Sequence, residues 1–130
     1  MYYSKNNKNL YVVDLLEIKK VTPAGKVNVV ADQLKDDKHP FEGVADRHYV
    51  YGLWTDNKNN LYAALFGAGK VKKFCTNGDI LTVFESPEGW SPCGGIIAPD
   101  ESLWIMEFSD KRTTRVRKIS TDGTHVICGS

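Results

Sequence analysis

The sequence lacks several features that would point directly to a class of protein. Lys and Arg together number 17 against 16 for Asp and Glu, so the formal net charge is only +1. Proteins that bind nucleic acid or an anionic membrane surface carry a basic surplus or a basic patch, so neither partner is expected. No apolar run approaches the roughly 18 residues of a spanning helix, and the N-terminus has no long apolar core typical of signal peptides. We therefore expect a soluble chain and assign no compartment.

Cysteine is scarce, and no sustained helical period is present. The three cysteines, Cys75, Cys93 and Cys128, are odd in number and do not have metal-type spacing, so a disulfide framework or a zinc site is not expected. No stretch combines a helical period with helix caps. Hydrophobic residues at 42% and charged residues at 25% are near the globular average, so the chain is expected to fold.

A repeated unit is present three times. Each copy holds a short apolar, β-prone run that follows a polar turn, as expected for a strand. The runs are LYVVD at 10–14, LYAAL at 61–65 and LWIMEF at 103–108. A second strand pattern then reads apolar, basic, basic, apolar and ends in a turn that closes on glycine. These segments are EIKKVTPAG, KVKKFCTNG and RVRKISTDG, and their glycines are predicted to adopt positive φ.

Each repeat is predicted to form four strands. A third strand follows each glycine, and a further strand precedes the polar turn at 50–55 and 94–98, whereas only MYYS stands there in the first copy. The three anchoring leucines are 51 and then 42 residues apart. Four antiparallel strands per repeat of about 40 to 45 residues is typical of a β-propeller. The prediction is an all-β propeller of about three four-stranded antiparallel blades, as a β-sandwich would not require such similar units.

The predicted blades cover the whole chain in a single partial domain. Blade 1 is expected at about 1–32, a polar connection at 33–47, blade 2 at about 48–87 and blade 3 at about 88–130. Propellers typically close with four to eight blades, so three blades would leave an apolar face exposed at each end. Three alternatives remain open: a fragment of a ring of six or more blades, a homodimer that closes a six-bladed ring, or an arc that persists alone.

These motifs resemble those of known propeller families. The order of turn, LYV or LWI, apolar-Lys-Lys-apolar and closing glycine resembles NHL-repeat and gluconolactonase-type propellers, and GGIIAPDESLWIMEF resembles a blade of streptogramin lyase. The resemblance covers nearly all of the chain outside 31–47. It implies that first strands line a central channel, and that ligands enter where first strands begin and second strands end. Fold alone does not decide function.

The resemblance selects residues at this channel mouth. Glu107 ends a second strand, where lyase-like blades carry a glutamate, but their histidine fourteen residues earlier is replaced here by Cys93. His48 is a second catalytic candidate because histidine titrates near neutrality. The expected ligand-binding residues are Tyr51 and Cys93 at aligned first-strand starts, Arg47 in the loop before the second blade, and Trp90 in a Pro/Gly-rich loop, at the position aligned with His48.

The resemblance to gluconolactonase-type propellers also implies a divalent metal. In those proteins an Asn before the first strand and an Asp at the end of a second strand supply ligands. Asp14 stands at such an end and is the predicted ligand for calcium or magnesium, which bind oxygen. The stretch from Pro92 to Gly95 lacks the corresponding Asn.

Two functions follow as hypotheses. The first is a propeller-type hydrolase or lyase that acts on a small lactone or sugar-like substrate, with Glu107 and His48 as its catalytic candidates. The second is a non-catalytic NHL-type module that binds a protein or ligand on its top face, where the channel mouth lies. The two differ in whether several polar side chains converge there.

Overall fold

The computed structural model describes residues 1–32, 34 and 44–129, and these form three separate four-stranded sheets. The first sheet consists of β1 (Tyr2–Tyr3), β2 (Leu10–Asp14), β3 (Glu17–Val21) and β4 (Val27–Ala31). The second consists of β5 (Val50–Thr55), β6 (Leu61–Leu65), β7 (Lys70–Phe74) and β8 (Ile80–Glu85). The third consists of β9 (Trp90–Ile97), β10 (Leu103–Ser109), β11 (Thr114–Ile119) and β12 (His125–Cys128).

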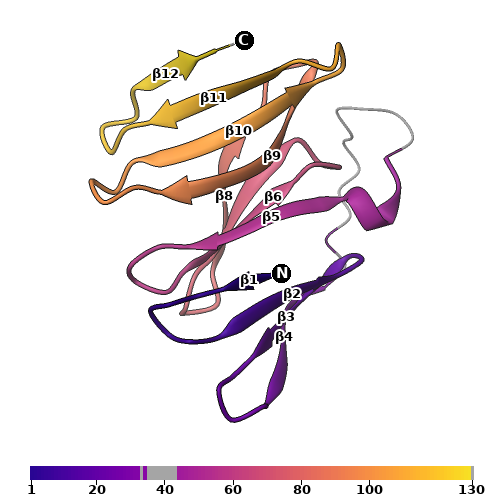
Figure 1. Ribbon diagram of the computed structural model, residues 1–130, viewed down its shortest axis with the longest axis vertical. Helices are drawn as coiled ribbons and strands as arrows, with labels where there is room; N and C mark the ends of the chain where they lie inside the picture. The colour runs from indigo at the N-terminus through magenta and orange to yellow at the C-terminus, as the bar shows by residue number, and fades with distance from the viewer. Residues whose placement is uncertain (33, 35–43, 130) are drawn as a thin grey trace.

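The sheets are stacked one on another along the molecule. Figure 1 shows the β1–β4 sheet at the lower end, the β5–β8 sheet in the middle and the β9–β12 sheet at the upper end. Every strand pairs antiparallel with its neighbour in sequence within its own sheet. This is the blade arrangement predicted from the repeat. Most of the predicted connection at 33–47 lies outside the described residues, and its described end contains the short 3-10 helix η1 (Asp46–His48).

The strand register confirms the repeat residue by residue. Each anchoring leucine pairs with the apolar residue that closes the next strand, and the pairs are Leu10 with Val21, Leu61 with Phe74 and Leu103 with Ile119. The predicted closing glycines also have positive φ, at 86° for Gly25, 96° for Gly78 and 87° for Gly123. The amide of each glycine donates a hydrogen bond three residues back, as in a tight hairpin turn.

Burial distinguishes the middle blade from the outer two. Every residue of β6 is buried, because its sheet is covered on both faces. In β10, buried residues alternate with more exposed ones, since one face of this sheet packs on the middle blade and the other is open. Side chains at alternate positions of a strand thus report directly which face has a neighbour.

Two hydrophobic cores lie between the three sheets. The buried core side chains between the first and second sheets include Tyr11, Ile18, Ala31, Leu61, Ala63, Leu65 and Phe74. Those between the second and third are Trp54, Tyr62, Ala64, Val71, Phe84, Leu103 and Ile105. We call the first strand of each sheet, β1, β5 or β9, its inner strand. The inner strands of the second and third sheets approach closely, because a Cβ built on Gly52 of β5 would lie 2.9 Å from the Cα of Gly94 in β9. Within the described residues, no helix is long and apolar enough to cross a membrane.

Candidate ligand site at the ends of the inner strands

A β-bulge occurs at the same repeat position in two inner strands. In β5 the register shifts between Val50 and Gly52, which leaves Tyr51 without a cross-strand partner. In β9 the pairing passes from Pro92 to Gly94, so Cys93 also has no cross-strand partner. A bulge turns its side chain away from the regular alternation of a strand. Tyr51 is 48% exposed, so the middle blade presents an aromatic ring near the start of its inner strand.

Aromatic rings continue from Tyr51 in both directions. The ring centroid of Tyr51 lies 4.8 Å from that of Phe66 and 5.8 Å from that of His48. Phe66 in turn lies 6.4 Å from Phe108 of the third blade. We call His48, Tyr51, Phe66 and Phe108 the aromatic row. The row joins the start of β5 to the far end of β10, across the second and third blades.

The predicted loop residues His48 and Trp90 differ in local structure, although they are aligned in the repeat. His48 is exposed at the end of η1, and Arg47 is exposed on the same turn. Trp90 is the first residue of β9 and pairs with Ser109, so the expectation that it lies in a loop is wrong. The third inner strand begins earlier than the 94–98 predicted from sequence, because Trp90, Ser91 and Pro92 continue the pairing with β10 beyond the bulge.

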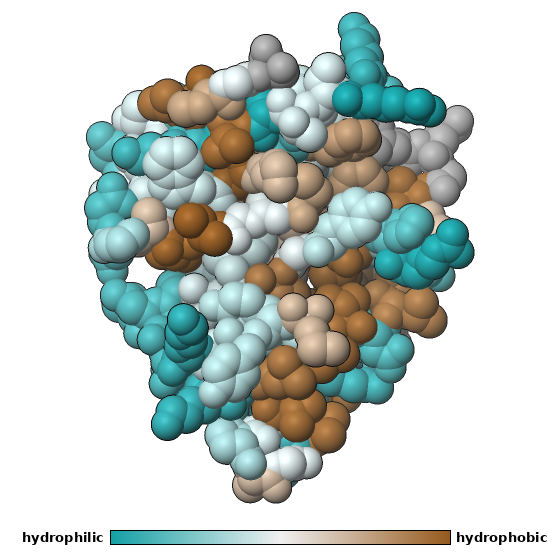
Figure 2. Space-filling view, viewed as in Figure 1, coloured by the Kyte–Doolittle hydropathy of each residue, from teal (hydrophilic) through white to brown (hydrophobic). Residues whose placement is uncertain are grey.

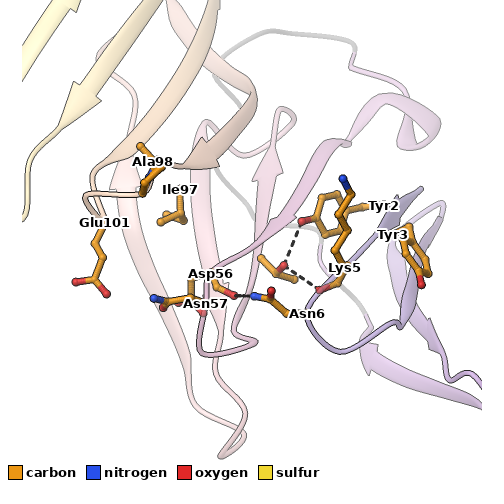
Figure 3. Close-up of a pocket in the computed structure, with 12 residues that line it drawn as sticks. Tyr2, Tyr3, Lys5, Asn6, Asp56, Asn57, Ile97, Ala98 and Glu101 are labelled. Atoms are coloured by element: carbon orange, nitrogen blue, oxygen red, sulfur yellow. Dashed lines mark hydrogen bonds between the residues drawn. The ribbon is translucent and has the colours of Figure 1, made fainter.

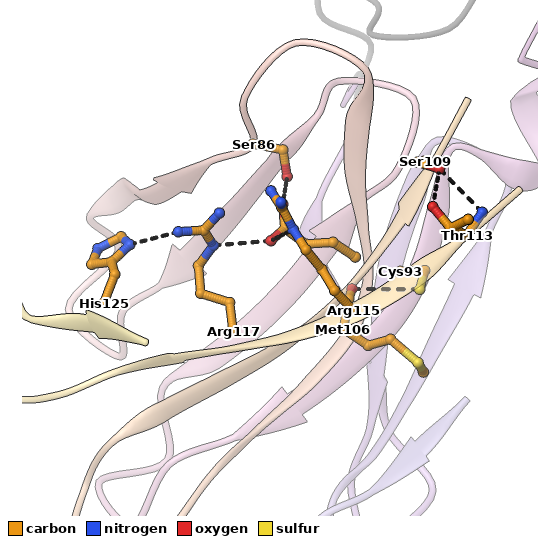
Figure 4. Close-up of polar contacts among 9 residues, drawn as sticks. Ser86, Cys93, Met106, Ser109, Thr113, Arg115, Arg117 and His125 are labelled. Carbon is orange, nitrogen blue, oxygen red and sulfur yellow. Dashed lines mark hydrogen bonds and ion pairs between the residues drawn. The ribbon is translucent and has the colours of Figure 1, made fainter. Parts of the chain in front are cut away.

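Glu107 lies at the centre of a buried charged cluster. Its side chain is fully buried, and Oε1 accepts hydrogen bonds from Nε of Arg115 at 3.1 Å and Nε of Arg117 at 2.9 Å. The hydroxyl of Ser86 in the second blade donates to Oε2 at 3.0 Å. Figure 4 shows the polar contacts of this cluster, including the one between Arg117 and His125, whose Nη1 and Nδ1 atoms are 3.0 Å apart.

The two arginines of the cluster also lie over aromatic rings. The guanidinium carbon of Arg115 is 3.8 Å from the ring centroid of Trp90, and that of Arg117 is 5.0 Å from the ring centroid of Phe84. Nη2 of Arg115 is buried and has no hydrogen-bond partner within the described part of the chain. Trp90 is therefore half-buried beneath a cation, a position that sequence reasoning did not anticipate.

This geometry changes the interpretation of Glu107. The resemblance predicts a mouth residue for acid/base chemistry at this position, but both carboxylate oxygens accept hydrogen bonds and no part of the side chain reaches solvent. A buried carboxylate is stabilised by such charged partners, and its single negative charge is shared between the two arginines. In this arrangement Glu107 orients Arg115 and Arg117 and ties the third blade to the second through Ser86.

Cys93 lies near Glu107, and its thiol is not activated as a nucleophile. Its thiol donates a hydrogen bond to the carbonyl oxygen of Met106 at an Sγ–O distance of 3.4 Å. Burial raises the pKa of the Cys93 thiol, and the charge of Glu107 raises it further. Because the reactive form of cysteine is the thiolate, this residue can serve as a neutral donor at neutral pH.

The described residues do not form a metal site by themselves. Oδ2 of Asp14, the predicted ligand, is 2.8 Å from Nζ of Lys19, and Glu17 is a second acidic neighbour of that lysine. The hydrogen bond and the charge of Asp14 raise the pKa of Lys19. In the part of the chain that the structure describes, no group of three or more His, Cys, Asp or Glu side chains could hold a metal ion.

A cavity of about 430 Å³ lies at the opposite ends of the inner strands and was not predicted. It lies among the turns that follow β1, β5 and β9, and Figure 3 shows Tyr2, Asn6, Asp56 and Ala98 around it. The Tyr2 hydroxyl lies 3.1 Å from Oγ1 of Thr55, and Nδ2 of Asn6 donates to the carbonyl oxygen of Asp56 at 3.4 Å. The signal in the sequence is the polar turn of each repeat, because residues of these turns line the cavity.

Comparisons with solved structures identify proteins of the same architecture. A gluconolactonase from Xanthomonas campestris superposes with a TM-score of 0.67 at 15% identity, over 95% of this chain and 43% of that one. A virginiamycin B lyase from Staphylococcus aureus superposes with a TM-score of 0.53 at 11% identity, over 97% of this chain and 57% of that one. A streptogramin B lyase gives a TM-score of 0.52 at 11% identity, over 97% and 56%.

The comparisons show the fold of the chain and how much of each solved structure it covers. No protein-family model matches the chain, and no curated protein matches its sequence. The chain spans about half the length of these solved structures. At identities of 11% to 15% the likeness is one of fold. The repeat, the three four-stranded sheets and these superpositions together identify the chain as a partial β-propeller of three blades.

Proposed function

We propose that the chain supplies part of the substrate site of a propeller-type hydrolase or lyase that acts on a small lactone or sugar-like compound. The observation that carries the proposal is the exposed ring of Tyr51, which stands at a bulge near the start of β5 and whose centroid lies 5.8 Å from that of the His48 ring. An exposed aromatic ring beside a titratable side chain suits a substrate with an apolar ring face and a labile proton.

His48 is the proposed general base. It is exposed on η1, and histidine changes its charge near neutral pH. It could accept a proton from a water that attacks an ester carbonyl, or from a carbon next to a carbonyl in an elimination. Tyr51 would hold the substrate ring, with the buried Phe66 packed against it, and Arg47 on the same turn as His48 would meet a polar substituent.

Residues of the third blade have supporting roles in this proposal. Glu107 positions Arg115, which in turn covers one face of Trp90, so the carboxylate is not free to meet a substrate. Cys93, at the bulge aligned with Tyr51, would contact a substrate as a neutral thiol. Because the described residues do not compose a metal site, no step of the proposal depends on a metal.

Turnover of a lactone panel by His48→Gln tests the proposal. We expect kcat to fall by about 100-fold or more, the range for loss of a general base, while the far-UV circular dichroism stays unchanged. His125→Gln on the outermost strand β12 is the matched histidine control and should retain activity. If the wild-type chain turns over members of the panel and His48→Gln does so equally well, the assignment of His48 is wrong.

The second candidate function is a non-catalytic module of the NHL-repeat type. The exposed ring of Tyr51 also favours it, since exposed aromatic side chains are common in binding surfaces. In that case the wild-type chain would bind a sugar or peptide ligand without turnover, and Tyr51→Ala would weaken binding whereas His48→Gln would not. Titration calorimetry with both variants separates the two functions.

A further inference from the structure

The two outer blades each present an open sheet face, and these faces differ. We call the open face of the first blade, which carries Leu10, Val12 and Asp14, its leading face. We call the open face of the third blade, which carries Trp104, Met106 and Val116, its trailing face. Pairing across the strands extends the leading face to Tyr3, Val27 and Val29, which are 55%, 58% and 57% exposed. Figure 2 shows hydrophobic residues reaching the surface near both ends of the stack.

The trailing face of the third blade contains an apolar hollow of about 310 Å³. Its lining includes Gly94, Ile96, Trp104, Met106 and Val116, and Ile96 and Met106 are 59% and 46% exposed. Nothing lies within 4 Å of a Cβ built on Gly94, among the residues that the structure describes. Exposed apolar surface of this kind is costly for a soluble protein and commonly marks an interaction site.

The repeat shows what packs on such a face. On the middle blade, the positions equivalent to Ile96, Trp104, Met106 and Val116 are Trp54, Tyr62, Ala64 and Val71. All four are buried in the core that also contains Leu103 and Ile105 of the following blade. A lysine lies over the aromatic ring at the same position in both blades. Nζ of Lys73 is 5.7 Å from the Tyr62 ring centroid, and Nζ of Lys118 is 5.5 Å from that of Trp104.

The leading face of the first blade is the matching half of this interface. Leu10 and Val12 are equivalent to Leu103 and Ile105 of the third blade, which fill the trailing face of the second. The same two positions on the middle blade, Leu61 and Ala63, are buried against the first blade. The chain therefore contains two contacts between a leading face and a trailing face, one on each side of the middle blade. The leading face of the first blade and the trailing face of the third blade remain without such a contact among the described residues.

We propose that a second copy of this chain covers both open faces in a closed head-to-tail dimer. The leading face of each copy would pack on the trailing face of the other, so two copies related by a twofold axis would bury all four open faces. A ring of the size of the gluconolactonase structure has room for this partner, because 95% of the chain superposes on only 43% of that structure. Neighbouring repeats of an array associate through equivalent interfaces in the same way.

The first test is the solution mass of the full chain by light scattering over a dilution series. The proposal expects a discrete species of about 29 kDa, twice the 14.6 kDa of one chain. Met106→Glu would place a charge in the apolar contact and is expected to weaken the dimer by about tenfold or more. Leu81→Glu, at a side chain of similar exposure (48%) on the outer strand of the middle blade, is the control and should leave the mass unchanged.

The second test uses complementation between two variants. Met106→Glu and Val12→Lys alter the two sides of the same proposed contact, so each chain alone should be largely monomeric. In an equimolar mixture, one interface would join the new glutamate to the new lysine and the other would be wild type, so the dimer should return. Melting curves of both variants confirm that each remains folded.

Several results would overturn the proposal. A monodisperse wild-type monomer would mean that a second copy does not cover the faces, and large polydisperse assemblies would mean open-ended stacking instead of a closed pair. Equal effects of Met106→Glu and Leu81→Glu would remove the trailing face from the interface. A mixture that stays monomeric although both variants are folded would exclude the predicted contact between Val12 and Met106.

Discussion

Nε of Arg117 lies 2.9 Å from Oε1 of Glu107, inside a cluster in which the side chain of Glu107 is fully buried. The adjacent Nε of Arg115 shares the same oxygen at 3.1 Å, and Ser86 reaches the other oxygen from the second blade. One carboxylate is thus paired with two cations of its own blade and accepts a hydrogen bond from the second blade. Such a cluster is sensitive to loss of its centre, because each arginine would then be buried without its counter-charge.

Glu107→Gln is expected to destabilise the fold by about 3 kcal/mol, the order found when one partner of a buried ion pair is removed. The amide keeps the shape but loses the charge that two guanidinium groups share. Urea unfolding followed by tryptophan fluorescence measures the change. Glu88→Gln, at an exposed loop position, should stay within about 0.5 kcal/mol of wild type. Equal stability of the two variants would mean that solvent reaches and screens the cluster.

The Cys93 thiol should react slowly with iodoacetamide at neutral pH. Burial and the charge of Glu107 both raise the pKa of this thiol, so its thiolate fraction in the folded chain is small. We expect the pH profile of alkylation, followed by mass spectrometry of the Cys93 peptide, to be displaced upward from that of the same peptide in denaturant. Coincident profiles would show that the thiol has the ordinary pKa of about 8.5.

The architecture was predictable from the sequence because it is repeated. Three copies of one pattern place Leu10, Leu61 and Leu103 in register, and the same register places Tyr51 and Cys93 at equivalent bulges. The environment of Glu107 was not predictable, since it depends on which face of β10 meets another blade. Of its two arginine partners, Arg117 comes from a basic position of the repeat, and Arg115 stands just before the apolar residue that opens the same pattern. Burial at this position is a tertiary property, and spacing along one strand does not encode it.

Asp56→Ala should destabilise the turn between β5 and β6 by about 1 to 2 kcal/mol, as for loss of a capping carboxylate. Oδ1 of Asp56 accepts the backbone N–H groups of Lys58 and Asn60, both at 2.9 Å, and Oδ2 accepts from the Tyr62 hydroxyl at 3.2 Å. Burial raises the pKa of Tyr62, and the charge of Asp56 raises it further, so this hydroxyl remains a donor.

The contribution of Asp56 should also depend on pH. Burial alone would raise the pKa of Asp56, but hydrogen bonds from Asn60, Lys58 and Tyr62 hold it below its ordinary value. Stability from a lowered pKa is present above the unfolded value of about 4 and is lost as the pH falls through the folded value. The difference in Tm between wild type and Asp56→Asn should therefore narrow in acid. A constant difference from pH 6 to pH 3 would contradict this linkage.

Gly52→Ala should be more harmful than the same change at Gly94, although both glycines occupy the same repeat position. A Cβ at Gly52 would lie 2.9 Å from the Cα of Gly94 and 3.2 Å from the carbonyl oxygen of Cys93, so the inner strands of adjacent blades would have to separate. Overpacking of this kind costs about 1 to 3 kcal/mol.

Gly94→Ala is the matched control, because nothing in the described residues lies within 4 Å of a Cβ there. Its unfolding midpoint in urea should stay close to that of wild type at protein concentrations where the chain is monomeric. Equal losses in the two variants would mean that glycine is needed at this position for its backbone freedom. A loss confined to Gly52→Ala would establish that β5 approaches β9 too closely for a side chain at this position.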